Sequence, residues 1–231
     1  MAETALSPGV AEVLLGNTWF RELPDDLARA LVSAATLRSF RAGEVIHCQG
    51  DPSDALYAVV SGSVKVSSIS ADGRECVFRY LTPGNWFGEI GMLDGLPRTH
   101  DAVAAQAARV LLLPPEALAD LLARHPVLYK FLALLLCRVV RTAFTMLNDT
   151  TLLSVSARLA KRLLSFAESA PAGGEIAVRL TQDELATLVN TTRQTVNKRL
   201  ADWQKLGWIE LRYGRIVIRN LDALRQLHLD E

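Results

Sequence analysis

Residues 37–113 consist of short runs in which apolar and polar side chains alternate, and turn-forming residues separate these runs about every ten positions. Alternation with a period of two indicates strands that bury one face. Glycine occupies turn sequences at Ala42-Gly43, Gly50-Asp51-Pro52, Ser61-Gly62, Asp72-Gly73 and Pro83-Gly84. Many short strands joined by tight turns predict a small antiparallel barrel or jelly roll, called the β-roll below.

A helical pattern precedes the β-roll. Residues 7–35 place apolar side chains at helical spacing, and Pro24 followed by Asp25 and Asp26 is typical of a helix N-terminus. We therefore expect helices in this stretch, and we expect them to pack against the β-roll.

After Pro114-Pro115 the apolar period lengthens to about 3.5 residues, which is the spacing of a coiled-coil seam. This pattern predicts a long dimerisation helix and therefore a homodimer, although an ordinary core helix has a similar periodicity. The predicted dimer interface consists of Leu128, Leu132, Leu135, Val139, Thr142 and Met146.

The pattern beyond residue 153 is that of further, shorter helices. Ser154 is a suitable N-cap for a helix that ends near residues 171–175. Thr181 and Glu184 have the spacing of a capping box, which predicts a helix beginning at Thr181. Asn190 can adopt the left-handed conformation of a tight turn after this helix.

A second helix and a hairpin complete this region. Thr192 can cap a helix whose Val196 and Leu200 face inward, and the two helices together have the pattern of a helix-turn-helix. Residues 208–220 alternate around Tyr213-Gly214 as a β-hairpin, or wing. The alternative to a DNA-binding helix-turn-helix is a helical hairpin whose charged face is merely exposed to solvent. The predicted DNA contacts are Thr181, Thr192, Arg193, Gln194, Asn197, Lys198, Arg212 and Arg215.

These patterns divide the chain into three regions. Residues 1–113 form the β-roll with its N-terminal helices, residues 114–153 the long-helix region, and residues 154–231 the winged helix-turn-helix. The predicted fold class is therefore α+β. A chain of 231 residues, half of them hydrophobic and 22% charged, is long enough and apolar enough for two globular cores.

Charge is distributed unevenly, although the net charge of the chain is zero. Residues 1–120 contain nine basic and fifteen acidic side chains, whereas residues 179–219 contain eight basic and four acidic ones. A basic module supplies the phosphate contacts on which much of nucleic-acid affinity depends. We therefore expect double-stranded DNA as a partner.

The cysteines indicate neither a disulfide framework nor a metal site. Cys48, Cys76 and Cys137 are few and widely spaced, so we expect buried or unreactive thiols and no bound metal.

The longest apolar run, residues 127–140, is interrupted by Tyr129, Lys130 and Arg138. This run is too short and too charged for a membrane span by the usual length rule. The N-terminal residues also lack a basic segment followed by an apolar one. We expect a cytoplasmic protein without a membrane partner.

A second motif, PGNWFGEIGMLDGLPRTH at residues 83–100, combines glycine turns with a short helical run. Backbone N–H groups in such a segment, together with an arginine, can hold an anion. Arg98 can bind a phosphate through two N–H groups, Thr99 can add a hydroxyl, and Glu89 can accept from a ribose hydroxyl. The chemistry alone is compatible with a phosphate-containing ligand or with tight turns in a barrel.

Residues 15–220 contain, in order, a β-roll with glycine turns, this motif, a long helix and a winged helix-turn-helix. This arrangement resembles the CRP/FNR family of bacterial transcription regulators. The resemblance implies a homodimeric regulator that is not an enzyme, binds a two-fold symmetric operator, contacts RNA polymerase, and responds to a cyclic nucleotide, cAMP or cGMP. It assigns ribose and cyclic-phosphate contacts to Gly88, Glu89, Ile90, Arg98 and Thr99.

The chain departs from the family's cyclic-AMP receptor in two places. The Thr-Ser pair that recognises adenine there falls at Ala143-Phe144, and Thr142 or Thr145 can replace it only if the register shifts by one. We include Thr142, Ala143 and Phe144 in the candidate effector site. The glutamate of the receptor's recognition helix is replaced by Gln194, which predicts a changed operator with adenine opposite Gln194.

Other effectors and functions stay open. The family also contains proteins that bind cyclic di-GMP, haem or no ligand, and His47, His100 and His125 are the candidate haem ligands. An iron-sulfur cluster is not expected, because no cysteine precedes Cys48. A nucleotide-hydrolysing enzyme, suggested by His100-Asp101, lacks the further metal ligands it needs. A regulatory subunit without a DNA role does not account for the helix-turn-helix.

Overall fold

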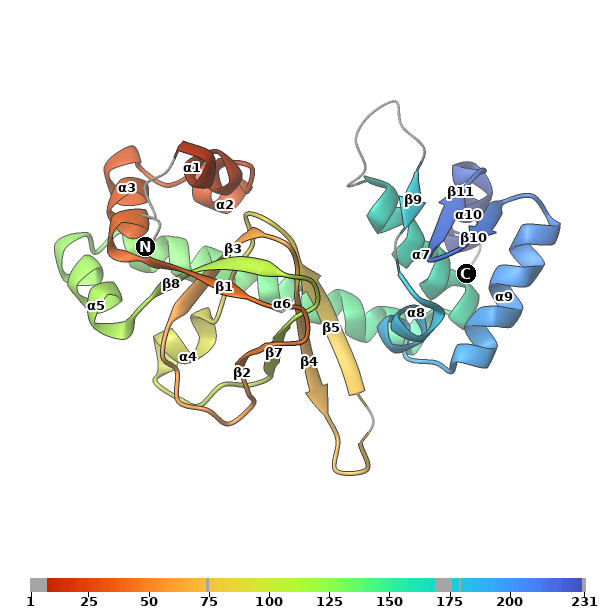
Figure 1. Ribbon diagram of the computed structural model, residues 1–231, viewed down its shortest axis with the longest axis horizontal. Coiled ribbons are helices and arrows are strands. Elements are labelled where there is room, and N and C mark those ends of the chain that lie inside the picture. The colour runs from red at the N-terminus through yellow and green to blue at the C-terminus, as the bar shows by residue number, and fades with distance from the viewer. Residues whose placement is uncertain (1–7, 74, 169–175, 179, 230–231) are drawn as a thin grey trace. The chain divides into compact units, whose positions relative to one another are not determined.

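The computed structural model describes residues 8–73, 75–168, 176–178 and 180–229 (Figure 1). The chain divides into two compact units, Met1–Arg141 and Thr142–Glu231. This division lies within the long helix, whereas the sequence patterns place boundaries at residues 113 and 153. Arg179 and the predicted helix end at 171–175 lie outside the described residues.

Two four-stranded antiparallel sheets in the first unit form the β-roll, and they confirm the prediction from alternation. The strands are β1 (Thr36–Phe40), β2 (Val45–His47), β3 (Leu56–Ser61), β4 (Val64–Ile69), β5 (Glu75–Leu81), β6 (Trp86–Phe87), β7 (Asp101–Ala104) and β8 (Ala108–Leu113). Their order is β1-β8-β3-β6 in one sheet and β2-β7-β4-β5 in the other. The predicted turns are also confirmed, because their glycines have the positive φ angles that favour glycine: Gly43, Gly50, Gly62, Gly73 and Gly84.

Strand β3 is buried on both faces, which explains its continuous apolar run. Tyr57 and Val59 belong to the core between the two sheets. Leu56, Ala58 and Val60 belong to a second core, in which helices cover the outer face of the same sheet. The strand therefore lies between two apolar layers, and alternation is lost there.

Six helices begin within the described residues of the first unit: α1 (Pro8–Leu15), α2 (Thr18–Arg21), α3 (Asp25–Ala34), α4 (Glu89–Asp94), α5 (Pro115–Arg124) and α6 (Leu128–Leu152). The N-terminal helices pack against the β-roll, as predicted. The ring centre of Trp19 lies 5.3 Å from that of Trp86, and Trp19 Nε1 donates to the backbone oxygen of Phe131 at 2.6 Å. These contacts hold the start of α6 against the β-roll.

Helix α6 corrects part of the predicted dimer seam. Leu128, Leu132 and Leu135 are buried in the core of their own unit, so they are not available to a second helix. Farther along, Val139 and Met146 are half-buried and Thr142 is exposed. The exposed, mostly apolar positions at seam spacing lie one or two residues later than the predicted ones: Ala133, Cys137, Val140, Phe144 and Leu147.

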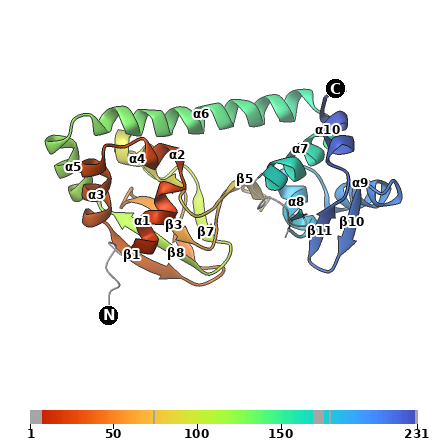
Figure 2. The ribbon, with the colours of Figure 1, turned by 90° about the horizontal axis from the view of Figure 1, so that it is seen from above.

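Helix α6 is also long and apolar enough, by length and composition, to cross a membrane (Figure 2). Residues 127–140 alone are too short for a membrane span, but the helix continues to Leu152 with few charges and reaches the required length. A single helix of this kind also occurs in the cores and interfaces of soluble proteins.

The second unit has the predicted winged helix-turn-helix. Its elements are α7 (Val155–Glu168), β9 (Ala177–Val178), α8 (Gln182–Leu188), α9 (Arg193–Lys205), β10 (Ile209–Arg212), β11 (Arg215–Ile218) and α10 (Leu221–Leu229). The strands form one antiparallel sheet in the order β10-β11-β9. Ser154 caps α7 as predicted, since its Oγ accepts from the Ala157 backbone N–H at 3.2 Å.

Candidate functional site

The turn at Gly88 lies against Arg98, ten residues later in the 83–100 motif. Gly88 precedes α4 with φ of 89°, in the left-handed region. A Cβ atom at this position would lie 2.7 Å from Arg98 Nη1 and 3.1 Å from the Ala55 backbone oxygen. Glycine is therefore required here both by the backbone conformation and by the close approach of Arg98.

Arg98 is buried, with 5% of its surface exposed, and is held by three oxygen atoms. Its Nη2 donates to Asp54 Oδ1 at 2.8 Å and to the Ala55 backbone oxygen at 2.6 Å, and its Nη1 donates to the Gly88 backbone oxygen at 3.1 Å. The Nε atom has no hydrogen-bond partner among the described residues. The guanidinium thus keeps donor capacity for a ligand in a site where its charge is poorly solvated.

Asp54 and Tyr57 position this arginine. The Arg98 guanidinium lies 5.1 Å from the Tyr57 ring centre, and the Tyr57 hydroxyl donates to Asp54 Oδ1 at 2.7 Å. Burial favours the neutral form of Asp54, but hydrogen bonds from Arg98 and Tyr57 outweigh it and hold the pKa of this carboxyl below its ordinary value. Neither residue was identified from the sequence, because each lies more than forty positions from Arg98.

Glu89 is the second buried charged group of the motif, with 3% exposure. Burial raises the pKa of its carboxyl, while its own backbone N–H and the positive charges of Arg79 and Arg98 oppose that rise. Among the described residues this carboxylate forms no direct ion pair, so it has capacity to accept hydrogen bonds from a ligand hydroxyl.

Not every predicted effector residue lies in this cluster. Gly88, Glu89 and Arg98 are brought together, Ile90 on α4 is half-buried, and Thr99 is exposed beside Arg98. The predicted α6 residues belong to the second unit and are all exposed there: Thr142, Ala143 and Phe144.

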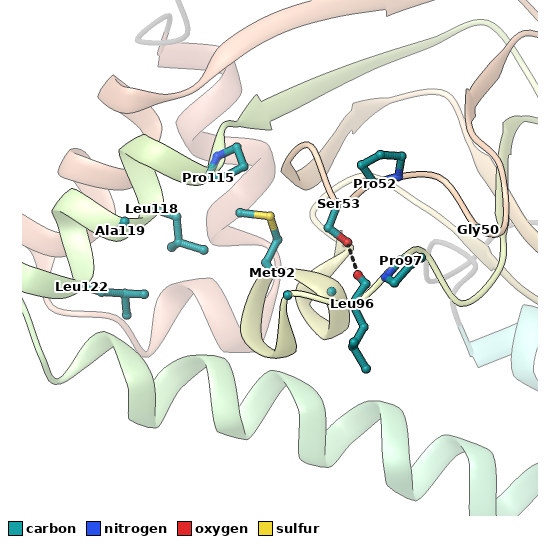
Figure 3. A pocket seen from close by; sticks show the side chains of 12 residues that line it. Gly50, Pro52, Ser53, Met92, Leu96, Pro97, Pro115, Leu118, Ala119 and Leu122 are labelled. Carbon is teal, nitrogen blue, oxygen red and sulfur yellow. Dashed lines mark hydrogen bonds between the residues drawn. The ribbon is translucent and has the colours of Figure 1, made fainter.

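A pocket of about 470 Å³ lies between residues of α4 and α5, and none of the buried charged residues lines it. Figure 3 shows Met92 of α4 between the α5 side chains Leu118 and Leu122 and the hydrogen bond from Ser53 to the Leu96 backbone oxygen. Its lining is mainly apolar, so it does not share the chemistry of the motif.

Within the described residues, no three His, Cys, Asp or Glu side chains are grouped to hold a metal ion. Cys48, Cys76 and Cys137 are free and exposed, so of the two expectations, buried or unreactive thiols, the first does not hold for any of them.

In the second unit, the first helix of the helix-turn-helix has the predicted capping box. Glu184 Oε2 accepts from the Thr181 backbone N–H at 2.7 Å, and Thr181 Oγ1 accepts from the Glu184 N–H at 3.2 Å. Asn190 has φ of 50°, which confirms the left-handed turn. Both predictions followed from local sequence alone.

The second helix, α9, presents a polar face. Thr192 caps it by accepting from the Thr195 backbone N–H at 3.2 Å, while Val196 and Leu200 are fully buried. The remaining predicted contacts lie on the other face: Arg193, Gln194 and Lys198 are exposed and Asn197 is half-buried. Arg193 forms an exposed ion pair with Asp183 at 3.1 Å.

The wing is an antiparallel hairpin in which Arg212 pairs with Arg215 across a two-residue turn. Arg212 donates to both carboxylate oxygens of Glu210, at 2.6 and 3.1 Å, and Arg219 also contacts this carboxylate. The hydrogen bond from Arg212 is the largest effect that lowers the pKa of Glu210 to about 2. Tyr213 at the tip is fully exposed.

Comparisons with known proteins match both units. Residues 37–125 match the cyclic nucleotide-binding domain, and residues 157–227 match the Crp-like helix-turn-helix domain. The CRP-like cAMP-activated global transcriptional regulator of Mycobacterium tuberculosis is 33% identical over 217 residues, covering 92% of this chain and 97% of that protein. The transcriptional regulator SdrP of Thermus thermophilus is 34% identical, covering 82% and 92%.

Solved structures agree with this match. A CRP/FNR family regulator from Thermus thermophilus has a TM-score of 0.71 and 30% identity, covering 84% of this chain and 98% of that one. The c-di-GMP responsive regulator CLP of Xanthomonas campestris shares the fold, with a TM-score of 0.74 at 21% identity and coverage of 84% and 99%. These relatives are transcription regulators, and neither matched domain is catalytic.

Proposed function

The chain belongs to the CRP/FNR family of transcription regulators, and we propose that it acts as a homodimer that binds a two-fold symmetric operator when a cyclic nucleotide occupies the β-roll. The observation that carries this proposal is the buried Arg98, which contacts the Gly88 turn and whose Nε has no hydrogen-bond partner among the residues that the structure describes. Buried charged groups with spare hydrogen-bonding capacity favour a charged, polar ligand over a purely structural role.

The cyclic phosphate would bind at Arg98 and Thr99, and the ribose hydroxyl would bind at Glu89. The 33% identical relative is named as cAMP-activated, which supports cAMP ahead of cGMP. Ala143 and Phe144 supply no side-chain hydroxyl for a base, so the phosphate and ribose contacts carry most of the affinity in this proposal. Both nucleotides therefore have to be tested.

The exposed face of α6 supports a homodimer. Val140, Phe144 and Leu147 are 44%, 63% and 60% exposed, and they alternate at the three- and four-residue spacing of a coiled-coil seam. In a parallel pair of α6 helices, Cys137 would face its counterpart across the two-fold axis. Oxidation of a chain whose other cysteines are replaced by serine should therefore give a covalent dimer, and a monomer after oxidation would contradict this seam.

DNA would be read by α9 in the major groove, with the wing beside the phosphate backbone. Two such helices about 34 Å apart match half-sites one helical turn apart. The effector can change DNA affinity only if it binds the DNA-competent arrangement more tightly than the alternative. Contact with RNA polymerase at the promoter, and action in the cytoplasm, belong to this proposal.

Calorimetric titration with cAMP and with cGMP, followed by operator binding at saturating nucleotide, tests the proposal. We expect binding of at least one nucleotide and tighter operator binding in its presence. Arg98→Lys keeps the charge but loses the paired donors, so nucleotide affinity should fall by about 100-fold, or roughly 3 kcal/mol. Unchanged affinity in this variant, with native thermal stability, would place the ligand elsewhere.

A further inference from the structure

A buried histidine beside the Arg98 cluster has no hydrogen-bond partner within the described part of the chain. His47, at the end of β2, is 5% exposed, and neither ring nitrogen forms a hydrogen bond with any described residue. An imidazole has at least one N–H donor in every protonation state, and an unpaired donor in the interior is unfavourable. His47 therefore has unused hydrogen-bonding capacity in a place where native side chains are normally satisfied.

The ring of His47 belongs to the same cluster as the phosphate-binding arginine. Its centre lies 5.7 Å from that of Tyr57, which also contacts the Arg98 guanidinium. It also lies 6.2 Å from the centre of His100, which follows Arg98 and Thr99 in the chain. Two histidines thus lie next to the residues proposed to hold the cyclic phosphate.

Thr99 connects His100 to that phosphate site. Thr99 Oγ1 and His100 Nδ1 are 2.7 Å apart, and the direction of the hydrogen bond depends on the protonation of the imidazole. If Nδ1 is unprotonated, the threonine hydroxyl donates to it and cannot also donate to a ligand. If Nδ1 carries a proton, it donates to Thr99, and the hydroxyl is released to donate to a phosphate oxygen.

Electrostatics favour neutral histidines before an anion arrives. Burial, followed by the charge of Arg98, lowers the pKa of His47 to about 4, and the same two causes lower the pKa of His100. Asp51 and Asp54 oppose the shift at His47, and Asp101 opposes it at His100. The charged groups that face the two rings are Asp51, Asp54, Arg79, Arg98 and Asp101, together with the rings themselves.

We infer that His47 and His100 complete the phosphate site and that binding of a cyclic nucleotide is coupled to proton uptake by these two histidines. This inference rests on the proposed function. A phosphodiester offsets the charge of Arg98 and supplies acceptor oxygens, so it stabilises both imidazolium forms. The phosphodiester itself does not titrate near neutral pH, so the protons come from solvent.

The direction of the pH dependence follows from this linkage. The pKa of each histidine is higher in the complex than in the free chain, so affinity rises as pH falls from the pKa of the complex toward that of the free chain. Each proton taken up gives at most about a tenfold change in affinity per pH unit. A histidine that merely donated from its neutral form would give no such dependence.

The test is calorimetry of the full chain with cAMP and with cGMP at about pH 6 and about pH 7.5, in two buffers of different ionisation enthalpy. We expect tighter binding at the lower pH and a buffer-dependent heat that reports proton uptake. His47→Phe and His100→Asn should each reduce the uptake, and the double variant should abolish it. His125→Asn, which changes a histidine at the end of α5, is the matched control and should behave as the native chain.

The outcomes separate this inference from the function on which it rests. Equal affinity at both pH values without buffer-dependent heat overturns the inference and leaves the cyclic-nucleotide function in place. Uptake that persists in the double variant assigns the proton to another group, such as Glu89, and also overturns it. If neither nucleotide binds at either pH, the proposed function fails and the inference fails with it.

Discussion

The two units of this chain present their polar groups in opposite ways. In the β-roll, Arg98 and Glu89 are buried, and residues distant in sequence hold the arginine in place. In the helix-turn-helix, Gln194 and Lys198 are exposed on α9, while the caps that define its helices join residues three positions apart. A change in the β-roll should therefore affect ligand binding and folding together, whereas in the helix-turn-helix the two effects should be separable.

Gly88→Ala is the strongest way to test the first half of this comparison. Alanine at φ of 89° is strained, and its Cβ would approach Arg98 Nη1 to 2.7 Å. The stability of the first unit should fall by about 2 kcal/mol, and nucleotide affinity should fall at least about tenfold. Thermal unfolding and calorimetry measure the two effects. Gly95→Ala is the control, because its φ is also positive but no atom lies near the added Cβ. Equal effects at both glycines would contradict a special role for Gly88.

Gln194→Ala tests the second half, because this side chain is exposed and takes part in no described packing core. Operator affinity should fall by about 1–3 kcal/mol, while thermal stability should change by no more than about 0.5 kcal/mol. Binding-site selection with the native chain and with Gln194→Glu measures the specificity of this position. If both proteins select the same operator sequence, Gln194 does not read a base.

The same contrast explains how much of the structure could be predicted from the sequence. The capping box at Thr181 and the turn at Asn190 depend on neighbouring residues, so the helix-turn-helix was predicted element by element. In the β-roll, the motif at residues 83–100 identified Arg98. Its partners Asp54 and Tyr57 come from other strands and loops, as does His47, which forms no hydrogen bond with any described residue. No local pattern associates these three residues with the motif.

The prediction of a long helix was confirmed, whereas three of the positions expected at its dimer interface are buried in the chain's own core. Its 3.5-residue period was recognised, but two faces of α6 are apolar, and the sequence does not distinguish the face that packs on the chain's own core from the face that is exposed. Leu132 belongs to the first face and Phe144 to the second. Only the folded unit shows which positions are already occupied.

Thr181→Ala should have the smallest effect and should change stability without changing effector binding. It removes the hydroxyl that accepts from the Glu184 N–H, and loss of such a cap costs about 1 kcal/mol. Thermal unfolding of the second unit measures this loss, and Thr181→Ser, which keeps the hydroxyl, should retain most of the stability. Nucleotide affinity in the β-roll should equal that of the native chain. If nucleotide affinity fell in parallel with stability, folding of the two units would be coupled. The buried effector site and the exposed DNA-binding face could then not be changed independently.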